Sequence, residues 1–183
     1  MTIKKIAHFF ICALTLTTLF SLSNDAHSQI KEPPQLDRYI EKWIKIPNIE
    51  GSLPSGEADI IKHKKGYVTV AFFLASWCIP CQKFTKELKQ IEEQYKNLNV
   101  RVIYVFNHDL ISDMNGFRQA HGIKSSLSIL ATNDALFSFR DPTLPTIFIA
   151  DKHGWIINKF VGTKDNSIKS EDITKALDYL ILK

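Results

Sequence analysis

A long apolar run that ends in two closely spaced cysteines constrains this chain more than any other feature. Residues 67–75 are mostly β-branched, aromatic or aliphatic without polar alternation, which is typical of a strand buried on both faces. Over residues 81–96 the apolar side chains recur every three or four positions, at Phe84, Leu88, Ile91 and Tyr95. This period predicts an amphipathic helix. The cysteines therefore lie where a buried strand turns into a helix.

The position of Cys78 and Cys81 at a helix start favours redox chemistry. A helix N-terminus has unpaired N–H groups and a partial positive charge that favour a thiolate, so we expect a lowered pKa for Cys78. Residues three apart on the first turn lie about 5–6 Å apart at Cβ, which allows a disulfide between Cys78 and Cys81. Pro80 fits the first turn, where its missing N–H loses no helical bond. The pair is predicted to alternate between dithiol and disulfide.

Three segments resemble those of a known family. Residues 77–81, Trp-Cys-Ile-Pro-Cys, resemble the W-C-x-P-C motif of thioredoxin-fold proteins, and more closely that of the periplasmic TlpA/ResA-like thiol-disulfide oxidoreductases. Residues 143–146, Thr-Leu-Pro-Thr, resemble the family's cis-proline loop, and residues 147–157 resemble its closing β-hairpin. The match spans residues 46–182 in the family's order, with Pro145 placed 64 residues after Cys81. This combination is more specific than C-x-x-C alone.

The resemblance implies a fold, a pair of catalytic residues and a docking edge. The fold is a thioredoxin-like α/β fold, with a central mixed β-sheet flanked by helices and a short N-terminal extension. Cys78 would be the nucleophile and Cys81 the resolving cysteine of a Cys78–Cys81 disulfide, with no metal or organic cofactor. A cis peptide at Pro145 would expose the backbone of Leu144 to an extended peptide. The residues expected to contact the substrate are Trp77, Ile79, Pro80, Leu144 and Pro145.

The N-terminal part of the chain is predicted to be separate from the folded domain. Lys4 and Lys5 precede an apolar run over residues 6–22, and residues 26–28 provide the small residues that a signal peptidase reads. Residues 1–28 are therefore predicted to be a cleaved secretory signal, whose loss would also remove Cys12. An uncleaved membrane anchor is the alternative, since the run is barely long enough to span. Residues 29–45 are expected to form a linker and a short helix, and residues 46–183 the thioredoxin-like domain.

Local patterns predict the other elements of the domain. Residues 46–54 are expected to form a small hairpin with Gly51 in its turn, followed by a charged, partly helical segment over residues 55–65. The further strands are expected at residues 99–106, at 128–131 as a short edge segment, and at 146–150 and 155–161 as a hairpin. The first of these should lie parallel to the strand at residues 67–75, because a helix connects the two. Helices are expected at residues 109–121, 134–139 and 170–182.

Other uses of the two cysteines agree less well with the sequence. A structural disulfide that closes a three-residue loop would constrain the unfolded chain little, and no second C-x-x-C or H-x-x-x-H completes a zinc site. A Cu(I) carrier that adds His153 to the thiolates stays an alternative, as does a peptide-binding module without redox turnover. The other histidines of the domain belong to no motif and are expected at the surface: His63, His108 and His121.

Two positions depart from the family pattern. TlpA/ResA-like proteins commonly carry Glu three residues after the second cysteine, and thioredoxins carry Asp six residues before the first. Phe84 and Phe72 stand at these positions. Cys81 therefore lacks an obvious local base, since Glu87 lies a helical turn further on. Residues 79 and 80 add neither charge nor a side-chain hydrogen bond to a Cys78 thiolate, which favours a reductant over a strong oxidant.

Composition and charge limit the partners. With 45% apolar and 23% charged residues the chain is an ordinary globular protein, and a scattered net charge of +4 is too small to indicate nucleic-acid binding. The expected partners are thiols and disulfides of exported proteins, such as apocytochrome c or copper-site proteins, together with a membrane electron donor. The protein is expected to be monomeric, and periplasmic or otherwise extracytoplasmic.

Overall fold

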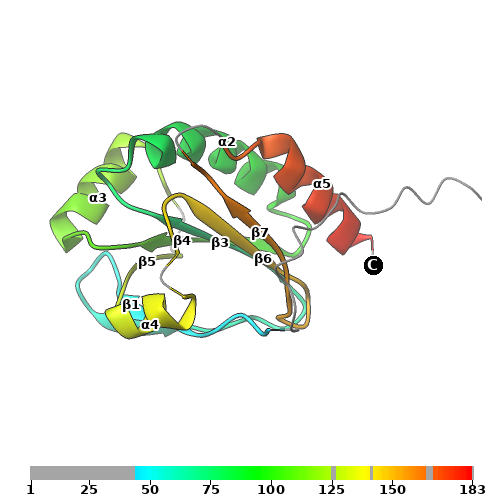
Figure 1. Cartoon of the computed structure of the whole chain (residues 1–183), viewed down its shortest axis with the longest axis horizontal. Helices are drawn as coiled ribbons and strands as arrows, with labels where there is room; N and C mark the ends of the chain where they lie inside the picture. The colour runs from blue at the N-terminus through cyan, green and yellow to red at the C-terminus, as the bar shows by residue number, and fades with distance from the viewer. Residues whose placement is uncertain (1–43, 125–126, 141, 164–166, 183) are drawn as a thin grey trace, which may run out of the picture. The chain divides into compact units, whose positions relative to one another are not determined.

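The apolar run that precedes the cysteines forms the middle of a β-sheet. In the computed structural model, which describes residues 44–124, 127–140, 142–163 and 167–182, this run is β3 (Val68–Leu74). All of its side chains are buried. It pairs in parallel with β4 (Val100–Phe106) and antiparallel with β6 (Thr146–Ala150) (Figure 1). The predicted buried strand and its parallel neighbour are confirmed, and both backbone edges of β3 are hydrogen-bonded.

The described residues form a seven-stranded mixed sheet in the order β2-β1-β5-β4-β3-β6-β7. On one side, β4 pairs in parallel with β5 (Ser128–Ala131), and β5 pairs antiparallel with β1 (Ile49–Ser52) of the hairpin β1–β2 (Ala58–Ile61). On the other side, β6 and β7 (Ile156–Val161) form the predicted closing hairpin. The mixed α/β thioredoxin-like architecture expected from the sequence is therefore present.

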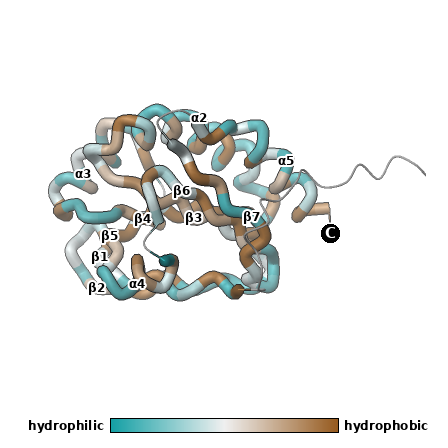
Figure 2. Tube along the Cα trace, viewed as in Figure 1, coloured by the Kyte–Doolittle hydropathy of each residue, from teal (hydrophilic) through white to brown (hydrophobic). Residues whose placement is uncertain are grey.

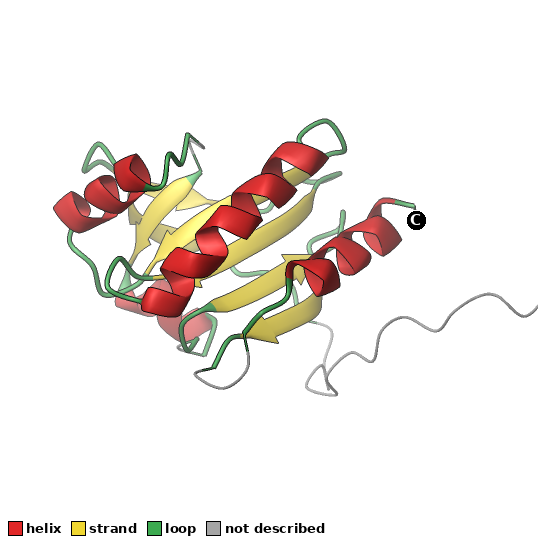
Figure 3. Cartoon of the chain, turned by 90° about the horizontal axis from the view of Figure 1, so that it is seen from above, coloured by secondary structure: helices red, strands yellow, loops and turns green. Residues whose placement is uncertain are grey.

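Helices cover both faces of this sheet (Figures 1 and 3). The face that carries α2 (Ile79–Tyr95), α3 (Ile111–Ala120) and α5 (Ser170–Ile181) is opposite the face that carries α4 (Asn133–Ser138). Because strand side chains alternate between the faces, Phe72 packs in the cluster under α2, whereas Phe73 packs with Phe139 of the α4 face at a ring distance of 4.7 Å. The helices predicted at residues 81–96, 109–121, 134–139 and 170–182 are confirmed to within a few residues.

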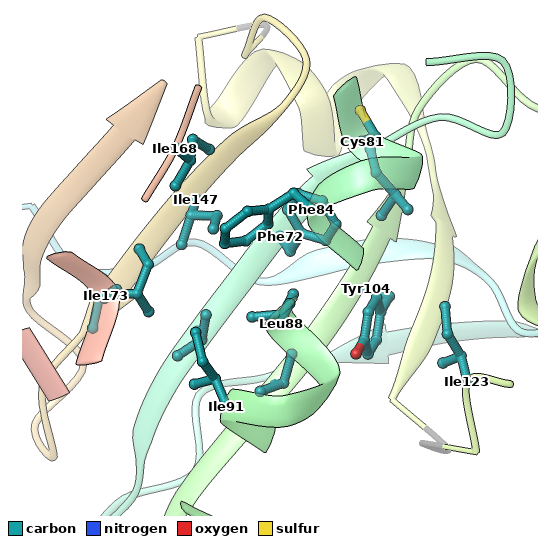
Figure 4. Close-up of a cluster of buried hydrophobic side chains, with 14 of the residues drawn as sticks. Phe72, Cys81, Phe84, Leu88, Ile91, Tyr104, Ile123, Ile147, Ile168 and Ile173 are labelled. Atoms are coloured by element: carbon teal, nitrogen blue, oxygen red, sulfur yellow. The ribbon is translucent and has the colours of Figure 1, made fainter. Parts of the chain in front are cut away.

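The larger apolar cluster lies between α2, α5 and the sheet. Figure 2 shows the apolar residues concentrated along the central strands, and Figure 4 shows Leu88 and Ile91 of α2 directed toward the side chains of the sheet. Two tyrosine hydroxyls form hydrogen bonds between these elements, one from α2 to α5 and one from β4 to α2. The Tyr95 hydroxyl donates to the Asp178 carboxylate at 2.6 Å, and the Tyr104 hydroxyl donates to a side-chain oxygen of Glu92 at 3.0 Å. Burial is the main cause, and the neighbouring carboxylate a smaller one, of a pKa above the ordinary range for both tyrosines.

The N-terminal hairpin differs from the prediction in position and in the role of its glycine. It spans residues 49–61 rather than 46–54, and residues 58–61, predicted to be partly helical, form the outer strand β2. Gly51 lies inside β1 rather than in a turn. A Cβ at this position would lie 2.2 Å from the carbonyl oxygen of Leu130, so glycine is required by the close approach of β1 to β5.

Two other expectations also change where the structure describes them. The segment 128–131 is an interior strand rather than an edge, because β1 pairs along its outer side. Residues 44 and 45, the end of the segment predicted to form a linker and a short helix, are not helical, and Lys45 forms a β-bridge with Trp155. The remainder of the segment 29–45 and the predicted signal over residues 1–28 lie outside the described residues. Within the described part, no helix combines the length and apolar character that crossing a membrane requires.

Candidate active site

The two cysteines lie at the N-terminus of α2 and are joined in a disulfide. Cys78 is the N-cap residue, with an extended backbone, and Pro80 lies in the first turn as predicted. The Cα atoms of Cys78 and Cys81 are 5.2 Å apart. The backbone N–H of Cys81 donates to the Cys78 sulfur at 3.2 Å, and the first turn of α2 contains no acidic residue. The helix end thus directs N–H groups and partial positive charge at the sulfur of Cys78.

The two sulfurs differ in their surroundings. Cys78 is 5% exposed and lines a groove, whereas Cys81 is completely buried. Cys81 belongs to the apolar cluster of Phe72 and Phe84, whose rings meet edge to face at 5.7 Å (Figure 4). Glu87 lines a separate cavity of about 300 Å³, and Cys81 is not among the described residues that line this cavity. The phenylalanines therefore replace the family's carboxylates with apolar packing, and Cys81 is shielded from solvent.

The carboxylate of Asp109, in the connection between β4 and α3, forms hydrogen bonds to the loop before Cys78. The Asp109 carboxylate accepts hydrogen bonds from the backbone N–H of Ser76 at 2.8 Å and from its hydroxyl at 2.7 Å. From the helix side, the Gln82 side-chain amide donates to the Ser76 carbonyl at 2.8 Å. The turn between β3 and α2 is thus fixed on both sides. Reasoning from the sequence did not identify Asp109 as part of the site.

A groove of about 520 Å³ lies beside the disulfide. It is lined by residues 77–80 of the cysteine loop, by residues 107–108 after β4, and by residues 142–144 before β6. Two of its apolar side chains are unusually exposed, Trp77 at 62% and Ile79 at 64%. Trp77 is therefore a surface residue beside the disulfide rather than a core edge. Because large apolar side chains on a surface often mark a contact site, the groove can hold part of another molecule next to Cys78.

The predicted docking residues do not all reach this groove. Leu144 lines it together with Trp77 and Ile79, and the Leu144–Pro145 peptide bond is cis, as the resemblance implied. Pro145 is buried and lines the separate 300 Å³ cavity, together with Pro80, which borders both spaces. The ring of Pro145 packs so closely on Gly162 that a Cβ there would lie 2.6 Å from it. Pro145 thus supports the loop from behind, while Leu144 faces the groove.

A family comparison agrees with this geometry. The family model described as "Thioredoxin-like" matches residues 66–156, which run from the start of β3 to the start of β7 and include both cysteines and the 142–145 loop. The chain belongs to the thioredoxin-like family.

Bacterial thiol-disulfide oxidoreductases are among the relatives of this thioredoxin-like protein. It is 24% identical over 116 residues to the thiol-disulfide oxidoreductase ResA of Bacillus thuringiensis strain Al Hakam, which covers 63% of this chain and 67% of the relative. A solved thiol:disulfide interchange protein of the thioredoxin family from Chlorobium tepidum TLS has a TM-score of 0.66 at 17% identity, covering 76% of this chain and 97% of that one. A secreted Mycobacterium tuberculosis disulfide oxidoreductase homologous to E. coli DsbE has a TM-score of 0.63 at 14% identity, with coverages of 72% and 95%.

Together these findings connect the site to a chemistry. The relatives named as thiol-disulfide oxidoreductases, the thioredoxin-like fold and the Cys78–Cys81 disulfide all support thiol-disulfide oxidoreductase activity for this thioredoxin-like protein. The two structural likenesses, at identities below one fifth, bear on the fold alone.

The three histidines that the sequence analysis expected at the surface differ in their surroundings. His108 lines the groove beside Cys78, which the sequence did not indicate. His63 is half-buried rather than at the surface, with ring nitrogens 3.3 Å from the Lys152 carbonyl and 3.5 Å from the Thr69 hydroxyl. His121, also half-buried, stacks on Phe117 at 4.2 Å.

His153 lies far from the cysteines, which removes the ligand that the copper alternative required. It is exposed in the turn after β6. Ala150 at the end of β6 pairs with Thr69 at the start of β3, whereas the cysteines follow the opposite end of β3. Among the described residues, no group of three or more His, Cys, Asp or Glu side chains is arranged to hold a metal ion.

Proposed function

We propose that this protein is an extracytoplasmic dithiol reductant that acts on disulfides of exported proteins through Cys78 and Cys81. The observation that carries the proposal is the asymmetry of the pair. The Cys78 sulfur is at the helix N-terminus and accepts the Cys81 N–H at 3.2 Å, and Cys78 lines the groove, whereas Cys81 is completely buried. A thiol at the groove can meet a partner's disulfide, and a shielded thiol one turn away can react only with its neighbour.

The reaction consists of two exchanges at sulfur. In the reduced enzyme, the Cys78 thiolate attacks one sulfur of the substrate disulfide, forming a mixed disulfide and releasing the other substrate sulfur as a thiolate that takes up a proton. Cys81 then loses its proton and attacks the Cys78 sulfur, which forms the Cys78–Cys81 disulfide and releases the second substrate thiolate. Two electrons and two protons pass to the substrate, and a separate electron donor must reduce the enzyme again.

The groove residues supply the contacts for an extended substrate. The exposed side chains of Trp77 and Ile79 offer apolar surface on one side of Cys78, and Leu144 lies in the loop on the other side. The backbone of an extended peptide can pair with the chain at Leu144 as an added strand. Pro80 borders the groove, and Pro145 positions Leu144 from behind through its packing on Gly162.

The direction of electron flow follows from what surrounds the Cys78 sulfur. A strong oxidant needs an unusually stable reduced thiolate, commonly with extra donors between the cysteines. Ile79 and Pro80 provide no such donor, so the helix end is the main stabiliser and the disulfide is expected to be hard to reduce. The protein therefore works as a reductant that a membrane electron donor regenerates, with apocytochrome c or copper-site proteins as substrate types.

Location outside the cytoplasm rests on the sequence. The first 28 residues have the pattern of a secretory signal. Expressed in a bacterial host, the mature protein should begin at Gln29 or within a few residues of it. Intact Met1 on membrane-bound protein would support the anchor instead.

Trapping of mixed disulfides tests the assigned roles. Cys81→Ser leaves the attacking thiol without its partner, so this variant should accumulate mixed disulfides with natural partners on non-reducing gels. Cys78→Ser should accumulate almost none, because the remaining thiol of Cys81 is enclosed. Equal trapping by the two variants would contradict the roles, and no trapping by either would contradict the function.

A further inference from the structure

Asn107 lines the groove next to Cys78, and its side-chain amide has an atom without a partner among the described residues. Asn107 follows β4, where its backbone N–H donates to the Leu74 carbonyl at 2.8 Å, and the residue as a whole is 1% exposed. Its Oδ1 is buried and accepts no hydrogen bond from the described residues. Native proteins leave few buried amide oxygens unbonded, because such an atom has lost its water without gaining a donor. The position in the groove indicates that the missing donor arrives with a ligand.

We propose that Oδ1 of Asn107 accepts a backbone N–H of the extended peptide segment that carries the substrate's disulfide. The inference rests on the proposed function, since the same groove holds the substrate against Cys78. An extended peptide directs successive N–H groups to opposite sides. If one residue pairs with the loop at Leu144, the N–H of the next is directed away from that loop and needs another acceptor. Asn107 is an acceptor on a different segment of the groove wall.

The lining of the groove favours a neutral donor over a lysine or arginine side chain. Residues 77–80, 107–108 and 142–144 include no aspartate or glutamate. A cationic side chain bound at Asn107 would therefore lose its hydration without meeting a counter-charge in the groove, which is unfavourable. A backbone N–H has no such charge to desolvate. Because proline has no N–H, the groove should reject substrates with proline at the residue that faces Asn107.

Backbone N-methylation provides the direct test. A disulfide-bearing peptide and its derivatives, each with one backbone N–H replaced by N–CH₃, are reduced by the wild-type enzyme and by Asn107→Leu, and kcat/KM is measured for each. In the wild-type enzyme one position should show a loss of about tenfold, the effect of one buried hydrogen bond. In Asn107→Leu the loss at that position should be less than about twofold. Asn107→Ala, which removes the amide without adding volume, serves as the second variant.

A matched control separates recognition from structure. Asn115 on α3 donates its side-chain amide to the Pro54 carbonyl at 2.9 Å, so Asn115→Leu breaks a bond within the protein and should lower the urea midpoint. It should retain the tenfold N-methyl effect. Asn107→Leu should not lower the midpoint, because Oδ1 has no bond to lose. A midpoint that falls as far as in Asn115→Leu would overturn the proposal, since it would reveal an internal role for Oδ1.

The remaining outcomes distinguish this inference from the proposed function. Dithionitrobenzoate, a small aromatic disulfide, reports the thiol chemistry of the wild-type enzyme without a peptide backbone. If the wild-type enzyme reduces neither this compound nor the peptides, the proposed function is wrong. If it reduces both but the N-methyl effect is the same in wild type and Asn107→Leu, or if no position shows an effect, the function stands and the role of Asn107 is wrong.

Discussion

Replacing Asp109 by alanine should lower the free energy of unfolding by about 3 kcal/mol. The Asp109 carboxylate accepts two hydrogen bonds from Ser76, at 2.8 and 2.7 Å. A hydrogen bond to a charged group contributes about 1.5–3 kcal/mol, and because both residues are half-buried, the lower limit applies to each bond. Asp109→Asn keeps one neutral acceptor and should lose about half as much.

A double-mutant cycle with Ser76→Ala measures the hydroxyl bond by itself. Ser76→Ala removes the hydroxyl but keeps the backbone N–H that also donates to Asp109. In this background Asp109→Ala should cost about 1.5 kcal/mol rather than 3, so the coupling energy should be about 1.5 kcal/mol. Urea unfolding of the oxidised proteins at neutral pH gives these values. Reduction of a peptide disulfide should also slow in Asp109→Ala, because the loop before Cys78 loses its anchor.

Asp113→Ala is the matched control for this cycle. Asp113 is also a carboxylate at the start of α3, but there it accepts only a long hydrogen bond, from the backbone N–H of Leu110 at 3.4 Å. Its loss should cost under about 1 kcal/mol through the helix dipole. The assignment would be refuted if Asp109→Ala were no more destabilising than Asp113→Ala, or if the coupling between Asp109 and Ser76 were below about 0.5 kcal/mol.

Three further predictions concern packing, pH and redox balance. Gly51→Ala should lower the urea-derived stability by more than about 3 kcal/mol, because its Cβ would lie 2.2 Å from a β5 carbonyl oxygen. Gly116→Ala on α3, where an added Cβ would meet no described atom outside its own helix within 4 Å, should instead raise the stability by about 0.5–1 kcal/mol. Equal effects would contradict the close approach of β1 to β5. Burial raises the folded-state pKa of Tyr95 and Tyr104, so the stability that each contributes is complete below about pH 10 and falls by about 1.4 kcal/mol per pH unit above it. Replacing either tyrosine by Phe should therefore make the alkaline decline of the free energy of unfolding, measured by urea titration, less steep. An unchanged slope would contradict this prediction. Equilibration with glutathione buffers should give a reduction potential nearer to about −270 mV than to about −120 mV, and a value above about −160 mV would make the protein a disulfide donor.

The sequence predicted the central unit of the fold because its signals are local. The change from an unbroken apolar run to a period of three or four residues is contained within residues 67–96, and the structure confirms both elements. The N-terminal hairpin was misplaced because its determinants are not local. Gly51 suggested a turn, but the glycine is required by contact with β5, which lies almost 80 residues further along the chain. The charged segment 55–65 suggested a helix, but an outer strand with one exposed edge also tolerates polar residues.

The candidate site was predicted where a motif exists and missed where only topology brings residues together. The Trp-Cys-Ile-Pro-Cys motif and the loop before β6 were identified directly. Asn107, His108 and Asp109 belong to no motif, yet all three follow β4, the parallel neighbour of β3. Parallel neighbours end at the same edge of a sheet, so the residues after β4 meet those after β3. Applied to the predicted strands, this rule would have directed attention to residues 107–109.

The unequal burial of the two sulfurs also determines the order in which partners can react. With Cys81 enclosed and Cys78 at the groove, every mixed disulfide, whether with an electron donor or with a substrate, forms at the same sulfur atom. The two partners therefore exclude each other and meet different forms of the enzyme, the donor meeting the disulfide and the substrate the dithiol. Steady-state kinetics should follow a ping-pong scheme with parallel double-reciprocal lines. A high concentration of either partner's product would then slow the other half-reaction by occupying the same groove.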